Sequence, residues 1–145
     1  MKCILSLILC SFFLSTVTGQ ILKKDVMVAI KRDNVNDLRT KTIPSLVNAC
    51  YDQKGSTFSL LGLSIKLKAK DCLNYLLIQE NINVNKACDN MSPLMYATKY
   101  NQLETVKKLI KAGADPDIEY KGKTAAFYAK RYKRTEIAEF LASLK

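Results

Sequence analysis

The sequence contains no histidine and no tryptophan among its 145 residues. Without histidine, the chain lacks the usual general base near neutral pH, the Ser-His-Asp and Cys-His catalytic arrangements, and zinc sites with imidazole ligands. Glycine and proline are also scarce, with five and three residues respectively. Neither of the two common glycine-rich phosphate-binding motifs occurs. These absences argue against an enzyme, and we expect no catalytic residue, no cofactor and no metal site.

The residues that are present predict one domain with a strong positive charge. The length suits a single domain, and 48% of the residues are hydrophobic, which is enough for a buried core. Lysine and arginine total 23 against 13 acidic residues, so the formal net charge is +10. Such a charge favours an acidic protein, an anionic membrane or a nucleic acid as partner. The alternative interpretation is a solvated basic surface without a ligand.

Residues 1–19 are typical of an export signal. Lys2 supplies a positive start, residues 3–17 form an uncharged and mostly apolar run, and Gly19 places a small residue before the cut. We therefore expect the protein to be exported, as a secreted or periplasmic chain without this segment. The alternative is an uncleaved membrane anchor, because the uncharged stretch continues through residue 22 and is long enough to span a bilayer.

Cleavage at this point leaves three cysteines, which are Cys50, Cys72 and Cys88. Three cysteines allow at most one disulfide with one thiol left over, and the sequence does not decide the pairing. We expect Cys72 to be a small buried apolar residue. In the absence of histidine, the three cysteines make a poor metal site.

A repeat with a period near 32 residues organises the second half of the chain. Residues 90–97 align without gaps with residues 122–129, so that Ser92 lies 32 positions before Thr124. The same offset relates the apolar ends of the helical segments that precede these two stretches. A period of this length, with two helical segments in each unit, predicts a helical solenoid.

Each unit carries the signals of two helices. Ser92 suits an N-cap, and Pro93 suits the first helical position, where its missing amide costs little. A second apolar stripe follows at helical spacing from Leu103 to Ile110. Gly113 then suits the left-handed position at which that helix ends.

These motifs resemble ankyrin repeats, whose units read G-x-T-P-L-H-x-A, then a second helix ending in L-L, then G-A-D. The runs Ser92–Leu94 and Leu109–Asp115 carry the resemblance most clearly. Met95 and Phe127 stand where the family has histidine, and we expect these apolar side chains to bury surface instead of forming hydrogen bonds. The resemblance implies an all-α solenoid of antiparallel helix pairs joined by hairpin loops.

The resemblance also divides the chain into segments. After the signal of residues 1–19, we expect a diverged N-terminal cap over residues 20–56 and repeats over residues 57–87, 88–119 and 120–145, the last acting as the C-terminal cap. A capping helix pair is predicted by four apolar residues, Val28, Ala29, Val35 and Leu38. We thus expect about three repeats behind this helix pair, in a monomer.

The resemblance implies a protein-interaction module rather than an enzyme. A small ankyrin protein with a signal sequence resembles those of intracellular bacteria, for which host-directed roles are proposed. We therefore expect an exported protein that acts as an effector on a host or extracytoplasmic protein. The alternative is a basic protein that binds an anionic membrane surface or nucleic acid, with nucleic acid the less favoured of the two.

The resemblance further implies where a partner binds, since ankyrin stacks bind through hairpin tips and the exposed face of their first helices. The first helices contribute Lys66, Lys99, Tyr100, Arg131 and Tyr132, and the tips contribute Tyr120, Lys121 and Lys123. Tyrosine and arginine dominate interface energies more often than lysine does. We expect Tyr100 and Arg131, about one repeat apart, to anchor the partner. The alternative is that both are ordinary surface residues.

Overall fold

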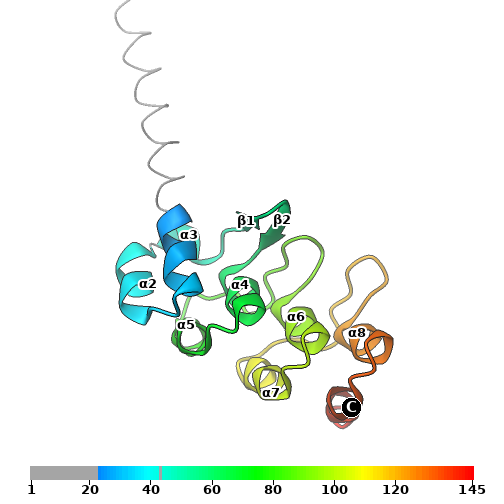
Figure 1. The fold of residues 1–145 in the computed structure, drawn as a ribbon. Helices are drawn as coiled ribbons and strands as arrows, with labels where there is room; N and C mark the ends of the chain where they lie inside the picture. Colours follow the sequence, from blue (N-terminus) through cyan, green and yellow to red (C-terminus); the bar gives the residue numbers. More distant parts are fainter. Residues whose placement is uncertain (1–22, 43) are drawn as a thin grey trace, which may run out of the picture.

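In the described part of the chain, four helix pairs stack side by side (Figure 1). The computed structural model describes residues 23–42 and 44–145, so the expected export signal of residues 1–19 lies outside the described residues. The first helices of the pairs are residues 23–31, α4 (Leu60–Leu67), α6 (Pro93–Lys99) and α8 (Ala125–Arg131). The second helices are α2 (Val35–Lys41), α5 (Lys70–Leu77), α7 (Leu103–Lys111) and α9 (Thr135–Ala142). This arrangement confirms the predicted helical solenoid.

The first helices of the later pairs begin at matching N-caps. Ser59, Ser92 and Thr124 each accept a hydrogen bond at the side-chain oxygen from the backbone amide three residues further on, at 3.1, 3.3 and 3.2 Å. Pro93 occupies the first position of α6, where no amide is needed. Because the starting point is the same in each repeat, the buried faces of the three helices stay aligned along the stack.

Every helix pair turns through the same backbone geometry. The residue that precedes the N-cap of each second helix has a positive φ and is not a glycine. The φ values are 50° for Asp33, 57° for Lys68, 58° for Asn101 and 54° for Lys133. A left-handed conformation is costly for such residues, so its recurrence in all four pairs shows that the turn is part of the repeat.

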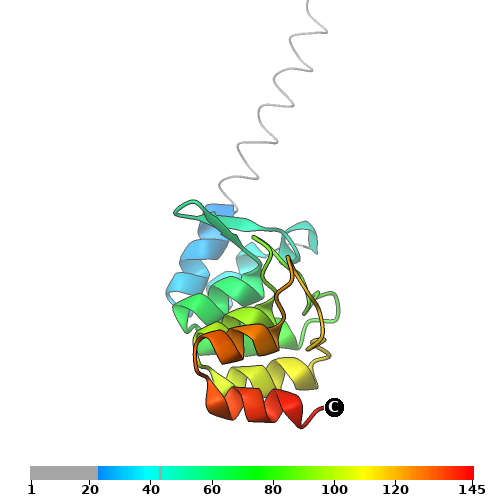
Figure 2. The same cartoon turned by 90° about the vertical axis from the view of Figure 1, so that its right-hand side faces the viewer.

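Two-residue turns close the hairpins that join successive helix pairs. The first hairpin pairs β1 (Tyr51–Gln53) with β2 (Ser56–Phe58) in antiparallel register, and Tyr51 lies opposite Phe58. The turns of the three hairpins are Lys54–Gly55, Asp89–Asn90 and Lys121–Gly122, and both residues of each turn have positive φ. This is the geometry of a type I′ turn. The hairpins project together from one end of the helix layers (Figure 2).

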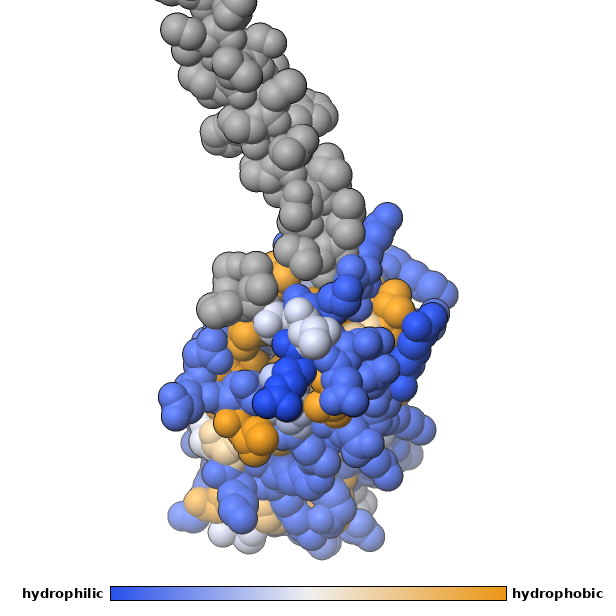
Figure 3. All heavy atoms as spheres, turned by 90° about the vertical axis from the view of Figure 1, so that its left-hand side faces the viewer, coloured by the Kyte–Doolittle hydropathy of each residue, from blue (hydrophilic) through white to orange (hydrophobic). Residues whose placement is uncertain are grey.

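The N-terminal segment holds more than the predicted helix pair. Between α2 and α4 the chain adds the short helix α3 (Pro44–Val47) and the β1–β2 hairpin. Val28, one of the residues that predicted the pair, is 42% exposed, whereas Ala29 and Leu38 are buried. Figure 3 shows this end of the stack as mainly hydrophilic with small apolar areas. Among the described residues, no helix is long and apolar enough to cross a membrane.

A disulfide joins Cys50 to Cys88 and so links the base of the first hairpin to the second hairpin. Beside it, the carboxylate of Asp89 accepts a hydrogen bond from the backbone amide of Thr57 at 3.0 Å. Cys72 is buried with a free thiol. Burial, followed by the nearby Asp33, raises the pKa of Cys72 to about 12, so the thiol stays protonated and poorly reactive near neutral pH.

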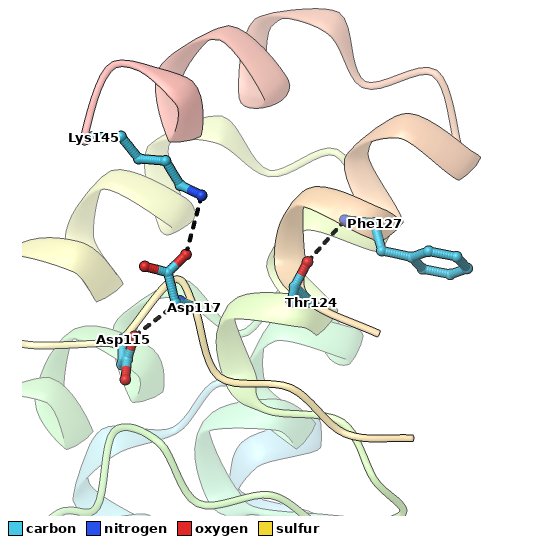
Figure 4. A network of polar contacts seen from close by, with 5 residues as sticks. All are labelled: Asp115, Asp117, Thr124, Phe127 and Lys145. Atoms are coloured by element: carbon cyan, nitrogen blue, oxygen red, sulfur yellow. Dashed lines mark hydrogen bonds and ion pairs between the residues drawn. The ribbon is translucent and has the colours of Figure 1, made fainter. Parts of the chain in front are cut away.

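The apolar core runs along the stack between the two helix layers, and its fully buried side chains include Leu38, Leu60, Leu94, Leu109 and Ile137. Met95 is 1% exposed and buries surface in the family's histidine position, as expected. Phe127 is not buried in this way, because the residue is 37% exposed. Figure 4 shows its ring pointing away from the stack. That expectation was therefore wrong for Phe127.

Asp33 connects the first helix pair to the second. Its carboxylate accepts hydrogen bonds from the backbone amides of Asp71 and Cys72, at 3.2 and 2.8 Å, at the start of α5. Burial alone raises the pKa of this carboxyl, but the hydrogen bonds from Cys72 and Asp71 outweigh burial and lower it. The charged form therefore stabilises the fold at neutral pH, and this contribution is lost as the pH falls through the lowered pKa.

Side chains of the loops tie neighbouring repeats together. Asn85 Oδ1 accepts a hydrogen bond from the amide of Asp115 at 2.9 Å, one repeat further on. At the C-terminal end, Asp115 accepts a bond from the amide of Asp117 at 2.9 Å, and Asp117 pairs with Lys145 at 3.5 Å (Figure 4). The close acidic pair Asp115 and Asp117 thus belongs to the loop structure.

Candidate partner-binding surface

One surface of the solenoid combines the outward sides of the first helices with the hairpins that rise from them (Figure 1). We call it the inner surface and define it by α4, α6 and α8, their C-terminal turns and the three hairpins. Aromatic side chains join its two parts. Phe58 of β2 packs against Tyr96 of α6 with 5.1 Å between ring centroids, and Lys123 of the third hairpin lies 6.0 Å from the ring centroid of Phe127 on α8.

Two stacked pairs of tyrosines recur on this surface. Tyr96 stacks on Tyr100, and Tyr128 stacks on Tyr132, each with 6.3 Å between ring centroids and with interplanar angles of 11° and 7°. A spacing of four residues along a helix brings both rings of a pair to the same face. Each residue of the first pair lies 32 positions before its counterpart in the second. Successive repeats therefore present the same aromatic arrangement.

Basic side chains lie over these rings. Each cationic group lies within about 6 Å of a ring centroid, a distance at which a cation is attracted to an aromatic face. Three contacts of this kind lie along the stack: Lys66 with Phe58 at 4.1 Å, Lys99 with Tyr100 at 5.8 Å, and Arg134 with Tyr132 at 5.9 Å. Each repeat of the inner surface thus holds a cation beside an aromatic ring.

The hydroxyls of Tyr96, Tyr100 and Tyr128 remain neutral at physiological pH. Burial, with smaller contributions from Asp89 and neighbouring tyrosines, raises the pKa of Tyr96 to about 12. Burial is also the main cause that raises the pKa values of Tyr100 and Tyr128. A neutral phenol both donates and accepts hydrogen bonds, so the half-buried Tyr100 and Tyr128 can donate to an anionic group of a partner, whereas Tyr96 is only 4% exposed and supports the stack from below.

The predicted binding residues of the first helices differ in exposure. Lys66, Lys99 and Tyr100 are half-buried, whereas Arg131 is exposed and Tyr132 is 36% exposed. The half-buried side chains are held by the aromatic contacts described above, which limits their rotational freedom. Lys66, Lys99 and Tyr100 are therefore partly immobilised, whereas Arg131 is exposed.

The predicted residues of the hairpin tips all lie in the third hairpin. Tyr120 is half-buried and pairs with Lys123 through two backbone hydrogen bonds of 3.0 and 3.1 Å. Lys121 occupies the turn with a φ of 51° and is exposed. Lys123 is also exposed and reaches toward α8. The third hairpin therefore adds positive charge next to α8, which is the first helix of the last pair.

The 32-residue offset relates the predicted binding residues of the last two repeats. Tyr100 and Tyr132 are the C-caps of α6 and α8, while Lys99 and Arg131 are the last residues of the same helices. Tyr100 is thus equivalent to Tyr132, and Arg131 is equivalent to Lys99. Each of the last two repeats presents its own cation and tyrosine, so the predicted anchors Tyr100 and Arg131 are adjacent positions of the unit in two successive repeats.

Four residues that shape the inner surface are not among the binding residues predicted from the sequence: Phe58, Tyr96, Tyr128 and Arg134. Phe58 and Tyr96 are buried, at 3 and 4% exposure, and support the surface from below. The two tyrosines had a visible signal, because each lies four positions before a tyrosine that was predicted. Phe58 depends on the hairpin register, which was not anticipated. Arg134 follows the helix, and its Nη2 donates to the carbonyl oxygen of Lys99 at 3.2 Å, so it bridges two repeats.

A groove of about 530 Å³ adjoins the inner surface. It lies between the α4–α5 turn and the α6–α7 turn, and its lining includes Leu73 and Leu103 together with Lys70 and Glu104. Tyr100 also lines this groove. A partner that contacts Tyr100 therefore has an apolar recess within reach.

The inner surface offers contact chemistry of three kinds, which are aromatic packing, hydrogen bonding by neutral hydroxyls and positive charge. Within residues 23–42 and 44–145, no group of cysteine, aspartate and glutamate side chains is placed to hold a metal ion. The described cysteines are a disulfide pair and one buried thiol. The features that the repeats share are thus those of a recognition surface.

Comparison with known proteins identifies the repeat. The family model described as ankyrin repeats (3 copies) matches the chain twice, over residues 26–120 and over residues 61–145. The two overlapping matches together extend from residue 26 to residue 145 and include every residue predicted for the binding surface. No curated protein matches the chain.

Proposed function

Because the chain belongs to the ankyrin-repeat family, we propose that it is a non-enzymatic module whose inner surface binds a protein partner. Ankyrin repeats are protein-interaction modules, in which a rigid stack of helices holds the hairpins and first helices in place. The observation that carries the proposal is the recurrence of a cation and a stacked tyrosine at equivalent positions, Lys99 with Tyr100 and Arg131 with Tyr132.

These side chains suit a binding surface for energetic reasons. Tyrosine and arginine are enriched among the few residues that dominate interface energies. Binding normally costs rotational freedom of the side chains that become ordered. Tyr100 and Tyr132 are already held by their stacking partners, so a partner that contacts them immobilises little further.

The proposal includes export. Residues 1–19 have the composition of a cleaved signal peptide, and the Cys50–Cys88 disulfide suits an oxidising compartment outside the cytoplasm. The partner is then a host or extracytoplasmic protein, as for the exported ankyrin proteins of intracellular bacteria that this sequence resembles. A chain anchored by an uncleaved N-terminal segment presents the same inner surface.

Substitution of the inner-surface side chains tests this proposal. A partner captured from target-cell extract and identified by mass spectrometry is titrated against the protein by calorimetry. Tyr100→Ala and Arg131→Ala should each weaken binding by at least about 1 kcal/mol. The unfolding temperature should change little, because Arg131 is exposed and Tyr100 is half-buried.

Lys108→Ala is the matched control. Lys108 lies on α7, in the layer of second helices, where its Nζ donates to Asn74 Oδ1 at 2.8 Å. Its loss should leave both binding and unfolding temperature nearly unchanged. An equal loss of affinity in Lys108→Ala would show that the inner surface is not the binding surface.

A further inference from the structure

The cations of the inner surface have no acidic counterpart within the described part of the chain. The ion pairs found there are Lys41–Asp25, Lys107–Glu104 and Lys145–Asp117, none of which includes an inner-surface cation. The cations concerned include Lys66, Lys99, Lys121, Lys123 and Arg131. In the hairpins the acidic side chains are Asp52, Asp89 and Glu119, and Asp89 already accepts a hydrogen bond from Thr57. The inner surface therefore carries unbalanced positive charge.

One face of each outer tyrosine ring is covered by a neighbouring ring. Tyr96 covers one side of Tyr100, and Tyr128 covers one side of Tyr132. A cation lies over each of the two outer rings as well, at 5.8 and 5.9 Å from the centroids. Single-stranded nucleic acids bind by stacking bases on free aromatic faces, and these rings are already occupied by neighbours. Neutral hydroxyls beside cations instead suit carboxylates.

We propose that the inner surface binds an extended acidic segment of a protein partner, with one carboxylate held by the cation and tyrosine of each of the last two repeats and a further one by Lys66. Lys99 and Tyr100 form one position, and Arg131 and Tyr132 form the next. Lys66 supplies the cation of the preceding repeat. The inference rests on the proposed function and adds the chemistry of the partner.

The geometry of the stack predicts the spacing of the acidic residues. Packed neighbouring helices lie about 8–10 Å apart, so successive carboxylate positions are separated by about that distance. A polyproline II segment turns once in three residues and advances about 9 Å in doing so. An acidic residue at every third position of such a segment therefore faces the surface once per repeat.

The test measures binding of labelled peptides to the full chain by fluorescence anisotropy at physiological ionic strength. One peptide repeats Glu-Pro-Ala four times, and its uncharged counterpart repeats Gln-Pro-Ala four times. The Glu peptide should bind at least about tenfold more tightly than the Gln peptide. A peptide of the same composition with its glutamates contiguous should bind more weakly than the regularly spaced one.

Two triple variants with the same change in net charge separate a specific site from diffuse attraction. Replacing Lys66, Lys99 and Arg131 by glutamine should weaken binding of the Glu peptide at least about tenfold. Replacing Lys107, Lys108 and Lys111 of α7 by glutamine should weaken it less than about twofold, because exposed charges at a distance are screened by salt. Both variants should unfold at nearly the temperature of the unsubstituted chain, since the replaced side chains are exposed or half-buried.

Equal losses in the two triple variants would overturn the proposal in favour of diffuse charge attraction. Equal binding of the Glu and Gln peptides would also overturn this proposal. The broader proposed function would still stand if Tyr100→Ala weakens binding of the captured partner. A third overturning result is tighter binding of an oligothymidylate than of the Glu peptide, lost in the inner-surface triple variant. That result would assign the surface to single-stranded nucleic acid.

Discussion

Replacing Leu109 by alanine is expected to lower the free energy of unfolding by about 2–5 kcal/mol. The side chain of Leu109 lies on α7 and is fully buried in the core between the helix layers. Its truncation removes apolar surface from the core and leaves a cavity that neighbouring residues fill only in part. Denaturant unfolding followed by circular dichroism measures the change.

Lys111→Ala, two residues further along the same helix, is the control for Leu109→Ala. The side chain of Lys111 is exposed and makes no hydrogen bond or ion pair with the described residues. Its loss should change the free energy of unfolding by no more than about 0.5 kcal/mol. Similar destabilisation by the two substitutions would contradict the assignment of the buried face of α7.

Reduction of the Cys50–Cys88 disulfide is expected to cost about 2–4 kcal/mol of stability. The bridge joins residues 38 positions apart in the chain and so restricts the unfolded state, and in the folded state it fastens the first hairpin to the second. Urea unfolding with and without a phosphine reductant gives the difference directly. Peptide mapping of the unreduced protein should recover Cys50 joined to Cys88.

Two variants isolate this effect. In Cys50→Ser/Cys88→Ser the reductant should no longer change the free energy of unfolding. In Cys72→Ala the reductant should lower the free energy of unfolding as much as in the unsubstituted chain. A bridge that includes Cys72, or a reductant effect that persists in the double variant, would contradict the pairing. The buried position of Cys72 and its raised pKa are the physical basis for this expectation.

The repeated part of the fold could be predicted because its signals are local. Ser92, Pro93 and Gly113 mark helix ends through their own backbone preferences, and the structure places them at the N-cap and first position of α6 and just after α7. The apolar stripe of α7 needs only its helical spacing to be recognised. These signals depend on neighbouring residues in the chain and not on distant contacts.

The missed features depend on contacts between distant residues. The β1–β2 strands have three residues each, too few for an alternating pattern to stand out. Three cysteines allow three pairings, and the choice follows only when the hairpins bring Cys50 and Cys88 together. Phe127 has the same place in its repeat as the buried Met95, so its exposure follows from its position in the stack and not from its type.

The candidate surface could be predicted in outline for a similar reason. The family resemblance located the cations and tyrosines at the ends of the first helices, including Tyr100 and Arg131. The 32-residue offset also relates Lys99 to Arg131 and Tyr100 to Tyr132, and the structure places both pairs at the ends of α6 and α8. The contact of Lys66 with Phe58 of the hairpin joins residues of different elements and has no sequence signal.

Site-specific photo-crosslinking tests most directly whether the inner surface is the binding surface. A photo-reactive phenylalanine derivative replaces Tyr132 on the inner surface in one variant and Lys108 on the second-helix layer in another. Each variant is irradiated in extract of the target cells, and the cross-linked species are resolved by electrophoresis and identified by mass spectrometry. We expect a specific protein adduct from position 132 that is absent from position 108. The same adduct at equal or greater yield from position 108 would contradict the account.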